Sequence, residues 1–419
     1  MKVSEEISAP PPSDEPRPPS IEEPRPRSTV ADVFIAFALG AATLLVYGIS
    51  QHFEGPSPYN FHVLLANAFV NGRIDLPQLS WLELAEWKGK FYTVFPPAPA
   101  LVLTPFALVW GEATDQAYFS IAMGSLNVAL CYATLRTLFK SRALAVWVSL
   151  LHAFGTIHWY HAQVGSGWYF AHIVAITFLW LALLASLHGR HFFWSGLFVG
   201  AAFLARLPTI FAALFFPIYF FSDFITLDGR RSRIHWRNGL AFSAGVLPGL
   251  LGYYLYNYLR FGTFEDVGYT LVLHPRDPSY IHGFLSLRYV PIHLREMFAT
   301  MPRVLPGPPY FAPSVFAMAI WIATPALVLM FRAPLFSRLT AASVVASLAI
   351  AAPNLMHGGN GFTQFGYRHT LDFLPFLLLL IAAGMRERVG WIAASLIVAS
   401  ILANIWGVVT LTVLDLYSF

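Results

Sequence analysis

Val-Ala-Asp-Val-Phe-Ile-Ala-Phe-Ala-Leu-Gly-Ala-Ala-Thr-Leu-Leu-Val-Tyr-Gly-Ile is the sequence of residues 30–49, and its one charged residue is Asp32. About twenty apolar residues in helical conformation cross the hydrocarbon core of a bilayer. The stretch therefore predicts a transmembrane helix, and similar apolar stretches recur along the chain to its end.

The composition of the whole chain agrees with this prediction. Of 419 residues, 57% are hydrophobic and 11% are charged, whereas about a quarter of a soluble protein is charged. We therefore expect an all-α polytopic membrane protein. The net charge of +4 fits basic loops beside a membrane and does not indicate nucleic acid as a partner. Cys131 is the single cysteine, which excludes an internal disulfide and a cysteine-based zinc site.

The first 28 residues differ from the rest of the chain. They contain eight prolines, six acids and four bases, and almost nothing apolar. Such a segment cannot bury enough surface to offset the entropy of ordering it. We expect residues 1–28 to form a disordered cytoplasmic tail, and residues 29–419 to form the transmembrane domain.

The distribution of lysine and arginine sets the expected topology. Residues 97–110 are rich in proline and too short for a full span, so we treat them as re-entrant or interfacial. The positive-inside rule then places the N-terminus in the cytoplasm and the C-terminus outside. About eleven spans are expected, near residues 30–49, 115–138, 143–161, 168–187, 192–206, 208–222, 238–258, 314–331, 336–352, 370–385 and 389–411.

Two long loops then lie on the outer, periplasmic face, at residues 50–114 and 259–313. Loops beyond about fifteen residues are usually functional, so an active site is expected on this face. In the first loop, apolar residues from Phe61 to Phe69 recur with helical spacing, and Asn60, Asn67 and Asn71 lie on the other side. This pattern predicts an amphipathic helix in the membrane interface, and simple anchoring is an equally good explanation of it.

Short motifs follow in a recognisable order. Residues 72–77 read Gly-Arg-Ile-Asp-Leu-Pro, and residues 89–97 read Gly-Lys-Phe-Tyr-Thr-Val-Phe-Pro-Pro. Residues 196–208 read Gly-Leu-Phe-Val-Gly-Ala-Ala-Phe-Leu-Ala-Arg-Leu-Pro. Residues 256–262 read Tyr-Asn-Tyr-Leu-Arg-Phe-Gly, and Gly358-Gly359 precedes Phe-Gly-Tyr-Arg at residues 365–368. Together with the topology, this order resembles the GT-C glycosyltransferase superfamily, in the branch of protein mannosyltransferases and the lipid A aminoarabinose transferase.

The resemblance implies transfer of a sugar from a polyprenyl-phosphate donor to an unknown glycan, lipid or protein acceptor, with inversion and without a cofactor or metal. Two departures matter. Where the family has its catalytic aspartate, residues 58–60 read Pro-Tyr-Asn, and the nearest acid is Glu54. Where the family often has Glu-Lys-Pro-Pro, residues 94–97 read Val-Phe-Pro-Pro. A non-catalytic relative that binds polyprenyl lipid, or a lipid or sugar transporter, therefore remains an alternative.

A carboxylate must take the proton of the acceptor hydroxyl. Glu54 is the first candidate because it follows the first span closely, and Asp75 is the second because it matches the acid of the family's Gly-Asp step. The alternative for each is an ordinary solvated loop acid. Weaker candidates are Glu83, Glu86, Glu265 and Asp266.

Cations must stabilise the leaving phosphate. Arg206, Arg260 and Arg368 fall at predicted outer ends of spans, where a guanidinium binds phosphate oxygens in a fork. Alternatively, such residues extend to the interface only to solvate their charge. Arg368 and Asp372 stand four residues apart, so an ion pair between them is expected.

Four further residues complete the predicted site. His158 and His161 lie near the second outer turn and are expected to hydrogen-bond phosphate or sugar, although a polar helix end explains them too. Lys90 and Tyr92 are substrate-binding residues by the family resemblance. No carboxylate lies near the histidines in sequence, so no metal site is expected. The localisation implied is a bacterial inner membrane, with lipid as a partner.

Overall fold

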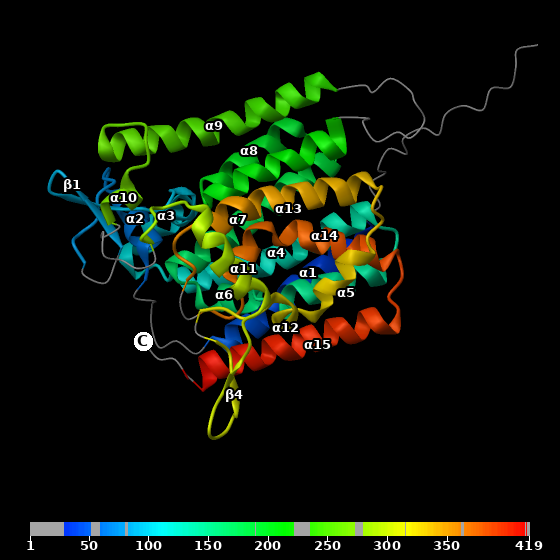
Figure 1. The fold of residues 1–419 in the computed structure, drawn as a ribbon. Coiled ribbons are helices and arrows are strands. Elements are labelled where there is room, and N and C mark those ends of the chain that lie inside the picture. Colours follow the sequence, from blue (N-terminus) through cyan, green and yellow to red (C-terminus); the bar gives the residue numbers. More distant parts are fainter. Residues whose placement is uncertain are drawn as a thin grey trace, which may run out of the picture.

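The structure, a computed structural model, describes residues 29–51, 59–79, 83–188, 190–221, 235–272, 280–314, 316–361, 364–414 and 416. Helices lie side by side along one direction and form a bundle (Figure 1). Seven of the described helical segments are long and apolar enough to cross a membrane. They are α1 (Val30–Ser50), α4 (Gln116–Leu138), α7 (Gly167–Leu187), α9 (Trp236–Phe261), α13 (Arg338–Met356), η7 with α14 (Arg368–Phe373 and Leu374–Met385), and α15 with η8 (Trp391–Val408 and Val409–Val413).

Shorter helical pieces occupy the other four predicted spans. Each is interrupted by a turn or a proline, so none of them reaches full membrane length as one helix. The number of spans near eleven therefore stays a prediction. The pieces are α5 (Arg142–Phe154) with α6 (His158–Val164), α8 (Phe192–Phe203), η2 (Leu207–Leu214) with η3 (Pro217–Phe221), and α12 (Ile320–Ala323) with η6 (Pro325–Arg332).

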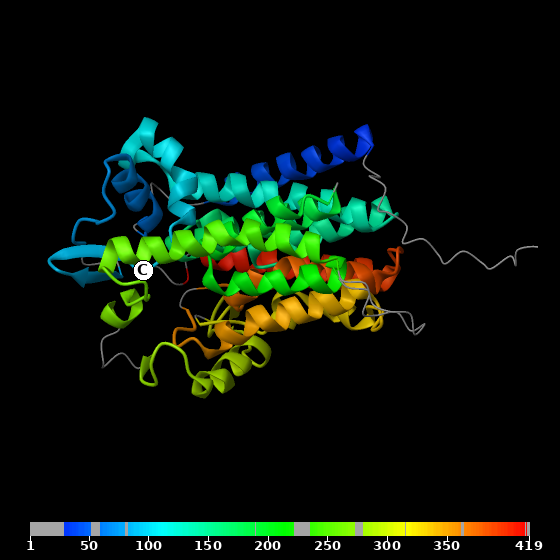
Figure 2. The ribbon, with the colours of Figure 1, turned by 90° about the horizontal axis from the view of Figure 1, so that it is seen from above.

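The two long loops lie at the same end of the bundle, which we call the loop end (Figures 1 and 2). The basic turns around residues 140–142 and 386–388 lie at the opposite end, the basic end. The loop end carries α2 (Phe61–Val70), β1 (Leu84–Trp87), β2 (Lys90–Thr93), α3 (Ala98–Trp110), η1 (Gly111–Ala113), α10 (Gly268–Val272), η5 (Leu287–Tyr289), α11 (Val290–Phe298), β3 (Arg303–Val304) and β4 (Phe311–Ala312).

An ion-pair cluster around the buried Asp32 stabilises the basic end. Asp32 lies in the first turn of α1, where its side chain also accepts a hydrogen bond from the Thr29 amide. One Asp32 oxygen accepts hydrogen bonds from Nε of Arg136 and Nε of Arg142, both at 2.9 Å, and from the Tyr132 hydroxyl at 2.8 Å. The one charge in the first apolar stretch is thus paired, and it ties α1 to α4 and α5.

Glycines bring α8 and α9 into backbone contact. Gly196 and Gly200 on α8 face Gly245 and Gly249 on α9, with four-residue spacing on each helix. A Cβ added to Gly249 would lie 2.6 Å from the Cα of Gly200. Small residues at this spacing let membrane helices approach closely. The glycines of the 196–208 motif therefore have a packing role.

The helix predicted near residues 61–69 is present as α2, and more of its surface is buried than the amphipathic pattern suggests. Seven of its ten residues are buried, including His62, whose Nε2 lies 3.0 Å from the carbonyl oxygen of Gly167. It packs against α3, and Phe61 contacts the ring of Phe95 at 5.0 Å between centroids. The two loop helices cover each other, so α2 is an internal helix of the loop end.

Candidate functional site

The centre of the loop end is a buried carboxylate, Asp372, at the start of the η7–α14 segment. Its Oδ1 accepts from Nδ1 of His172 at 2.6 Å and from Nε of Arg206 at 3.2 Å. Its Oδ2 accepts from Nη2 of Arg206 and from Nδ2 of Asn354, both at 3.0 Å. The carboxylate is thereby saturated, and it holds Arg206 as a fork.

The predicted ion pair between Arg368 and Asp372 is wrong. Residues 368–373 form a 3₁₀ turn, with three residues per turn in place of 3.6. Positions four apart therefore do not lie on one face, and Asp372 pairs with Arg206 from the end of α8. Arg368 has no ion pair with any carboxylate in the described part of the chain.

The guanidinium of Arg368 is partly buried and lies near other charged and polar groups. Its Nε atom is buried and has no hydrogen-bond partner among the described residues. The groups close enough to interact with its charge include Tyr169, Arg206 and Glu83. Burial, together with the charges of Arg206 and Arg368, lowers the pKa of His357 to about 3. The guanidinium groups of Arg206 and Arg368 therefore act on the same small region. Asp372 forms an ion pair with Arg206 and not with Arg368.

Three histidines surround this region with one ring nitrogen each left without a partner in the described structure. Nε2 is buried and unpartnered in His161, His172 and His369. In His172, Nδ1 donates to Asp372, so Nε2 is an acceptor while the ring is neutral. In His369, Nδ1 lies 3.4 Å from Nη2 of Arg206 and accepts from it, so Nε2 carries the proton. The site thus offers both donors and acceptors to a ligand.

A carboxylate also lies within electrostatic reach of the arginines. Burial raises the pKa of Tyr269 on α10, the charge of Arg206 lowers it, and that of Glu83 raises it. Glu83, just before β1, also accepts a hydrogen bond from Nε1 of Trp168 at 3.4 Å. The sequence ranks Glu83 as a weaker candidate, and the structure brings it closer to the arginines than its position in the chain suggests.

Two of the expected loop residues pair with each other. Nζ of Lys90 lies 3.2 Å from Oδ1 of Asp75, and Nη1 of Arg73 lies 3.9 Å from Oδ2 of Asp75. Tyr92 is buried and packs edge-on against the ring of Phe261 at 5.6 Å. Asp75 therefore already has two cations, both of them exposed. Glu54 lies outside the described residues.

Arg260 is committed to contacts within the protein. Its Nη1 donates to the carbonyl oxygen of Thr93 at 2.6 Å, and its Nη2 donates to the side chain of Asn257. The guanidinium lies 4.0 Å from the centre of the Tyr256 ring. These contacts join the end of α9 to β2. The Nε of Arg260, like that of Arg368, has no hydrogen-bond partner among the described residues. Arg260 differs from Arg368 in that both of its Nη groups have partners and Nη2 lies 3.9 Å from Oδ1 of Asp266.

The two predicted histidines lie in different surroundings. His158 lies deep in the bundle, where Nδ1 is 3.1 Å from the Tyr47 hydroxyl and Nε2 is 3.3 Å from Nδ2 of Asn127. His161 lies nearer the arginines, and its ring contacts that of Tyr169 at 4.3 Å. The structure thus brings Arg368 within electrostatic reach of both Arg206 and His161, whereas Lys90 and Asp75 pair with each other.

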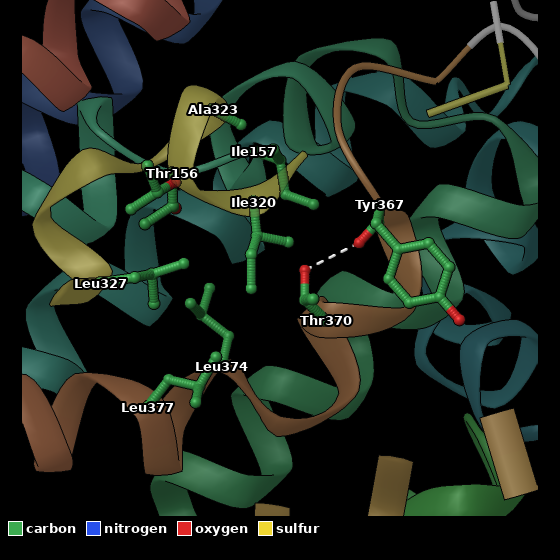
Figure 3. A pocket seen from close by; sticks show the side chains of 10 residues that line it. Thr156, Ile157, Ile320, Ala323, Leu327, Tyr367, Thr370, Leu374 and Leu377 are labelled. Carbon is green, nitrogen blue, oxygen red and sulfur yellow. Dashed lines mark hydrogen bonds between the residues drawn. The ribbon is translucent and has the colours of Figure 1, made fainter. Parts of the chain in front are cut away.

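A small cavity of about 20 Å³ lies directly beside this region (Figure 3). Its walls come mainly from α12, η6 and the η7–α14 segment, and side chains such as Ile320, Leu327 and Leu374 point into it. The Thr370 hydroxyl donates to the carbonyl oxygen of Tyr367 at 2.8 Å and offers little to a ligand. The cavity is apolar and the size of one water molecule, so it is a packing gap beneath the polar site.

His172, His369, Asn354 and the role of Asp372 are absent from the sequence-based site. One signal could have found them: each is a polar residue inside or at the end of an apolar segment, and such residues in membranes are often functional. The pairing itself could not have been found, because Arg206 and Asp372 are 166 residues apart.

No protein-family model and no curated protein sequence matches the chain. Solved structures do resemble it. ArnT from Cupriavidus metallidurans, solved with undecaprenyl phosphate bound, matches with a TM-score of 0.52 and 16% identity over 87% of this chain and 61% of its own. The oligosaccharyltransferase of Archaeoglobus fulgidus matches with a TM-score of 0.50 and 12% identity over 91% of this chain and 55% of its own.

This chain thus spans about three fifths of the length of the first and just over half of the second. At these identities the likeness concerns the fold, and it agrees with the superfamily indicated by the sequence motifs. The chain is an integral membrane protein with the fold of the GT-C glycosyltransferase superfamily.

Proposed function

We propose that this protein is a membrane glycosyltransferase. It transfers a sugar from a polyprenyl-phosphate donor to an acceptor at the loop end, which faces the periplasm of a bacterial inner membrane. The observation that carries the proposal is Arg368, whose buried Nε has no partner among the described residues beside a second, fixed guanidinium. Unpaired charges are costly within membrane proteins and are kept for function, and a phosphate is the ligand that fits two arginines.

The reaction needs three events at this site. The acceptor hydroxyl attacks the anomeric carbon, the bond between that carbon and the phosphate oxygen breaks, and the hydroxyl proton passes to a carboxylate. One direct displacement of this kind inverts the anomeric centre. Arg368 binds the leaving phosphate, and Arg206 adds its charge in a direction fixed by Asp372. The arginines supply the positive charge, so the proposal invokes neither a metal nor a cofactor.

Three carboxylates compete for the role of base. Glu54 remains the first candidate from the sequence. Glu83 has the support of its charge interaction with Tyr269 and Arg368. Asp75 is the weakest of the three, because its two carboxylate oxygens already face Lys90 and Arg73.

The test is transfer of radiolabelled sugar by the purified protein in lipid vesicles, from a panel of polyprenyl-phosphate sugars, with binding of polyprenyl phosphate measured alongside. We expect Arg368→Gln to weaken binding of polyprenyl phosphate by roughly 10- to 100-fold, since a hydrogen bond to a charged group contributes about 1.5–3 kcal/mol. Arg288→Gln, at an exposed arginine of the second long loop, is the matched control and should bind normally. Unchanged binding by Arg368→Gln would refute the assigned phosphate site.

The same assay identifies the base. Glu54→Gln, Glu83→Gln and Asp75→Asn should keep donor binding, and the one that removes the base should lose transfer by roughly 100-fold or more. Equal transfer by all three variants would contradict a carboxylate base from the first loop.

A second candidate is a non-catalytic protein that binds polyprenyl lipid. The observation that favours it is the sequence Pro-Tyr-Asn at residues 58–60, where the family has its aspartate. In that case polyprenyl phosphate binds with the same dependence on Arg368, and neither transfer nor donor hydrolysis occurs with any sugar.

A further inference from the structure

A second feature of the loop end is unrelated to the arginine site. Residues 301–313, which we call the proline hairpin, contain β3 and β4 in antiparallel register, with Arg303 opposite Ala312 and Val304 opposite Phe311. Figure 1 shows the hairpin projecting sideways from the bundle, across the direction of the helices, at the level where α15 ends. It therefore extends in the plane of the membrane and not along the membrane normal.

The surface of the proline hairpin is apolar. Val304 is 76% exposed, Tyr310 57% and Phe311 54%, and Met301 at its base is 66% exposed. Arg303 is the one charged residue in the thirteen-residue segment. An exposed apolar surface of this kind on a projecting loop marks an interaction site.

The backbone of the hairpin is also suited to an apolar medium. Five of its residues are prolines, at positions 302, 306, 308, 309 and 313, and have no amide hydrogen. At the tip, the Leu305 amide donates to the carbonyl oxygen of Tyr310, and the Tyr310 amide donates to that of Gly307, both at 2.8 Å. Irregular backbone is unfavourable in lipid because amide groups without hydrogen-bond partners are costly there. In this hairpin the prolines have no amide hydrogen and some other amides are bonded internally, which lowers the free-energy cost of entering lipid.

The contacts at the base of the hairpin indicate its level relative to the membrane. Nε1 of Trp406, close to the end of α15, donates to the carbonyl oxygen of Phe311 at 3.3 Å. Beside the base of the hairpin, the rings of Phe298 and Trp321 stack at 4.7 Å, and Nε1 of Trp321 donates to the carbonyl oxygen of Phe298. Tryptophans gather where the hydrocarbon of a bilayer meets its head groups. The hairpin leaves the bundle at that level.

We propose that the proline hairpin inserts sideways into the lipid leaflet at the loop end, with bilayer lipid as its partner. The alternative occupant is a second copy of the chain. Pro302 and Pro313 flank the two strands, and proline at an edge blunts strand pairing between chains. The inference does not depend on the proposed enzyme activity.

The chain is well suited to a direct test, because Cys131 is its only cysteine and is buried. In a Cys131→Ala background, Tyr310→Cys is labelled with an environment-sensitive fluorophore and reconstituted into vesicles of phosphatidylcholine and phosphatidylglycerol. We expect the emission maximum of the attached label to be blue-shifted from that of the free fluorophore in buffer. Lipids that carry a nitroxide near the head group should quench the label strongly, and aqueous iodide should not quench it.

Two controls bracket the result. A label at Lys88→Cys, in the exposed turn between β1 and β2, should respond to iodide, and a label at Leu402→Cys, on the lipid-facing side of α15, should respond to nitroxide lipids. If the Tyr310 label behaves like the Lys88 label, the proposal is wrong. If it is shielded from iodide but insensitive to nitroxide lipids, and becomes exposed when the protein is diluted in lipid, the occupant is a second copy and the proposal is again wrong.

Discussion

Among single residues, Asp372 has the largest expected effect on stability. It is fully buried and neutralises Arg206 through two oxygen atoms. Removing one member of a buried ion pair costs about 3–5 kcal/mol, because the other charge stays behind without compensation. We therefore expect Asp372→Asn to lower the unfolding temperature of the detergent-solubilised protein markedly.

The matched control for that variant is Asp75→Asn, which removes a carboxylate from an ion pair whose cations are exposed. Exposed pairs contribute about 0–1 kcal/mol, so this variant should unfold almost like the parent protein. Equal unfolding temperatures for the two variants would mean that the Arg206–Asp372 pair does not support the loop end.

A second residue, Glu296 on α11, predicts a pH dependence. Burial raises its pKa to about 7, although Asn360 donates a hydrogen bond to it. An acid whose pKa is raised on folding binds more protons when folded, so its contribution to stability falls as pH rises from about 4.5 to 7. Glu296→Gln should remove this loss, of the order of 3 kcal/mol, and unfold at a higher temperature than the parent at pH 8 but not at pH 4.

Glu86→Gln, at an exposed position on β1, is the control for that experiment. It should leave the difference between pH 4 and pH 8 unchanged. A Glu296→Gln variant with the parental pH profile would show that the buried carboxyl group does not titrate in this range.

At this scale the sequence identifies residue types better than partners. Arg206, Arg260 and Arg368 are predicted as phosphate-binding residues, and the structure brings Arg206 and Arg368 to one region, whereas Arg260 binds Thr93 and Asn257. Their different roles could not be predicted. Asp372 pairs with Arg206 and not with Arg368 because residues 368–373 form a 3₁₀ turn and because the end of α8, 166 residues earlier, lies beside it. The spacing of residues along the sequence predicts neither feature.

Among the elements, the contact between α8 and α9 is the most sensitive to small changes. A Cβ on Gly249 would meet three backbone atoms of Gly200 at 2.6–2.7 Å. Backbone cannot move aside as a side chain can, so Gly249→Ala must push the helices apart, at a cost of about 1–3 kcal/mol. We expect a lower unfolding temperature in detergent.

Gly48→Ala on α1 is the control, because nothing lies within 4 Å of the added methyl group. In a helix it should be neutral or slightly stabilising. If both alanine variants unfold alike, close approach of the two helices is not needed for stability.

The positions of the long apolar helices are the structural feature that the sequence predicts best. Hydropathy alone locates α1, α4, α7, α9, α13 and α15 to within a few residues, since each must present an apolar surface about as long as the membrane is thick. It does not reveal that α2 is an internal helix. An interfacial helix and a helix covered by a neighbouring loop bury similar apolar residues, so their patterns look alike.

For the whole molecule, the orientation of the bundle in the membrane can be tested. The two long loops share one end of the bundle, and the basic turns share the other (Figure 2). In cells that produce the Cys131→Ala protein, Lys88→Cys should react with a membrane-impermeant thiol reagent from outside. Arg388→Cys, in the turn between α14 and α15, should react only after the membrane is opened.

Reaction of both cysteines from the same side would contradict the arrangement of the bundle. Reaction of Arg388→Cys from outside, with Lys88→Cys protected, would reverse the orientation that the positive-inside rule predicts. The GT-C fold itself could be predicted from the order of motifs, whereas the number of complete spans could not, because four of them are built from broken helices.

The position of α14 has a consequence for how the protein is made. Nearly the whole η7–α14 segment is enclosed by α4, α5, α7, α13 and η6. All of these are synthesised before it. The earlier helices must therefore leave a central slot open while the ribosome completes the chain, and α14 enters that slot from lipid. Its uniformly apolar surface serves both environments, first facing acyl chains and then protein.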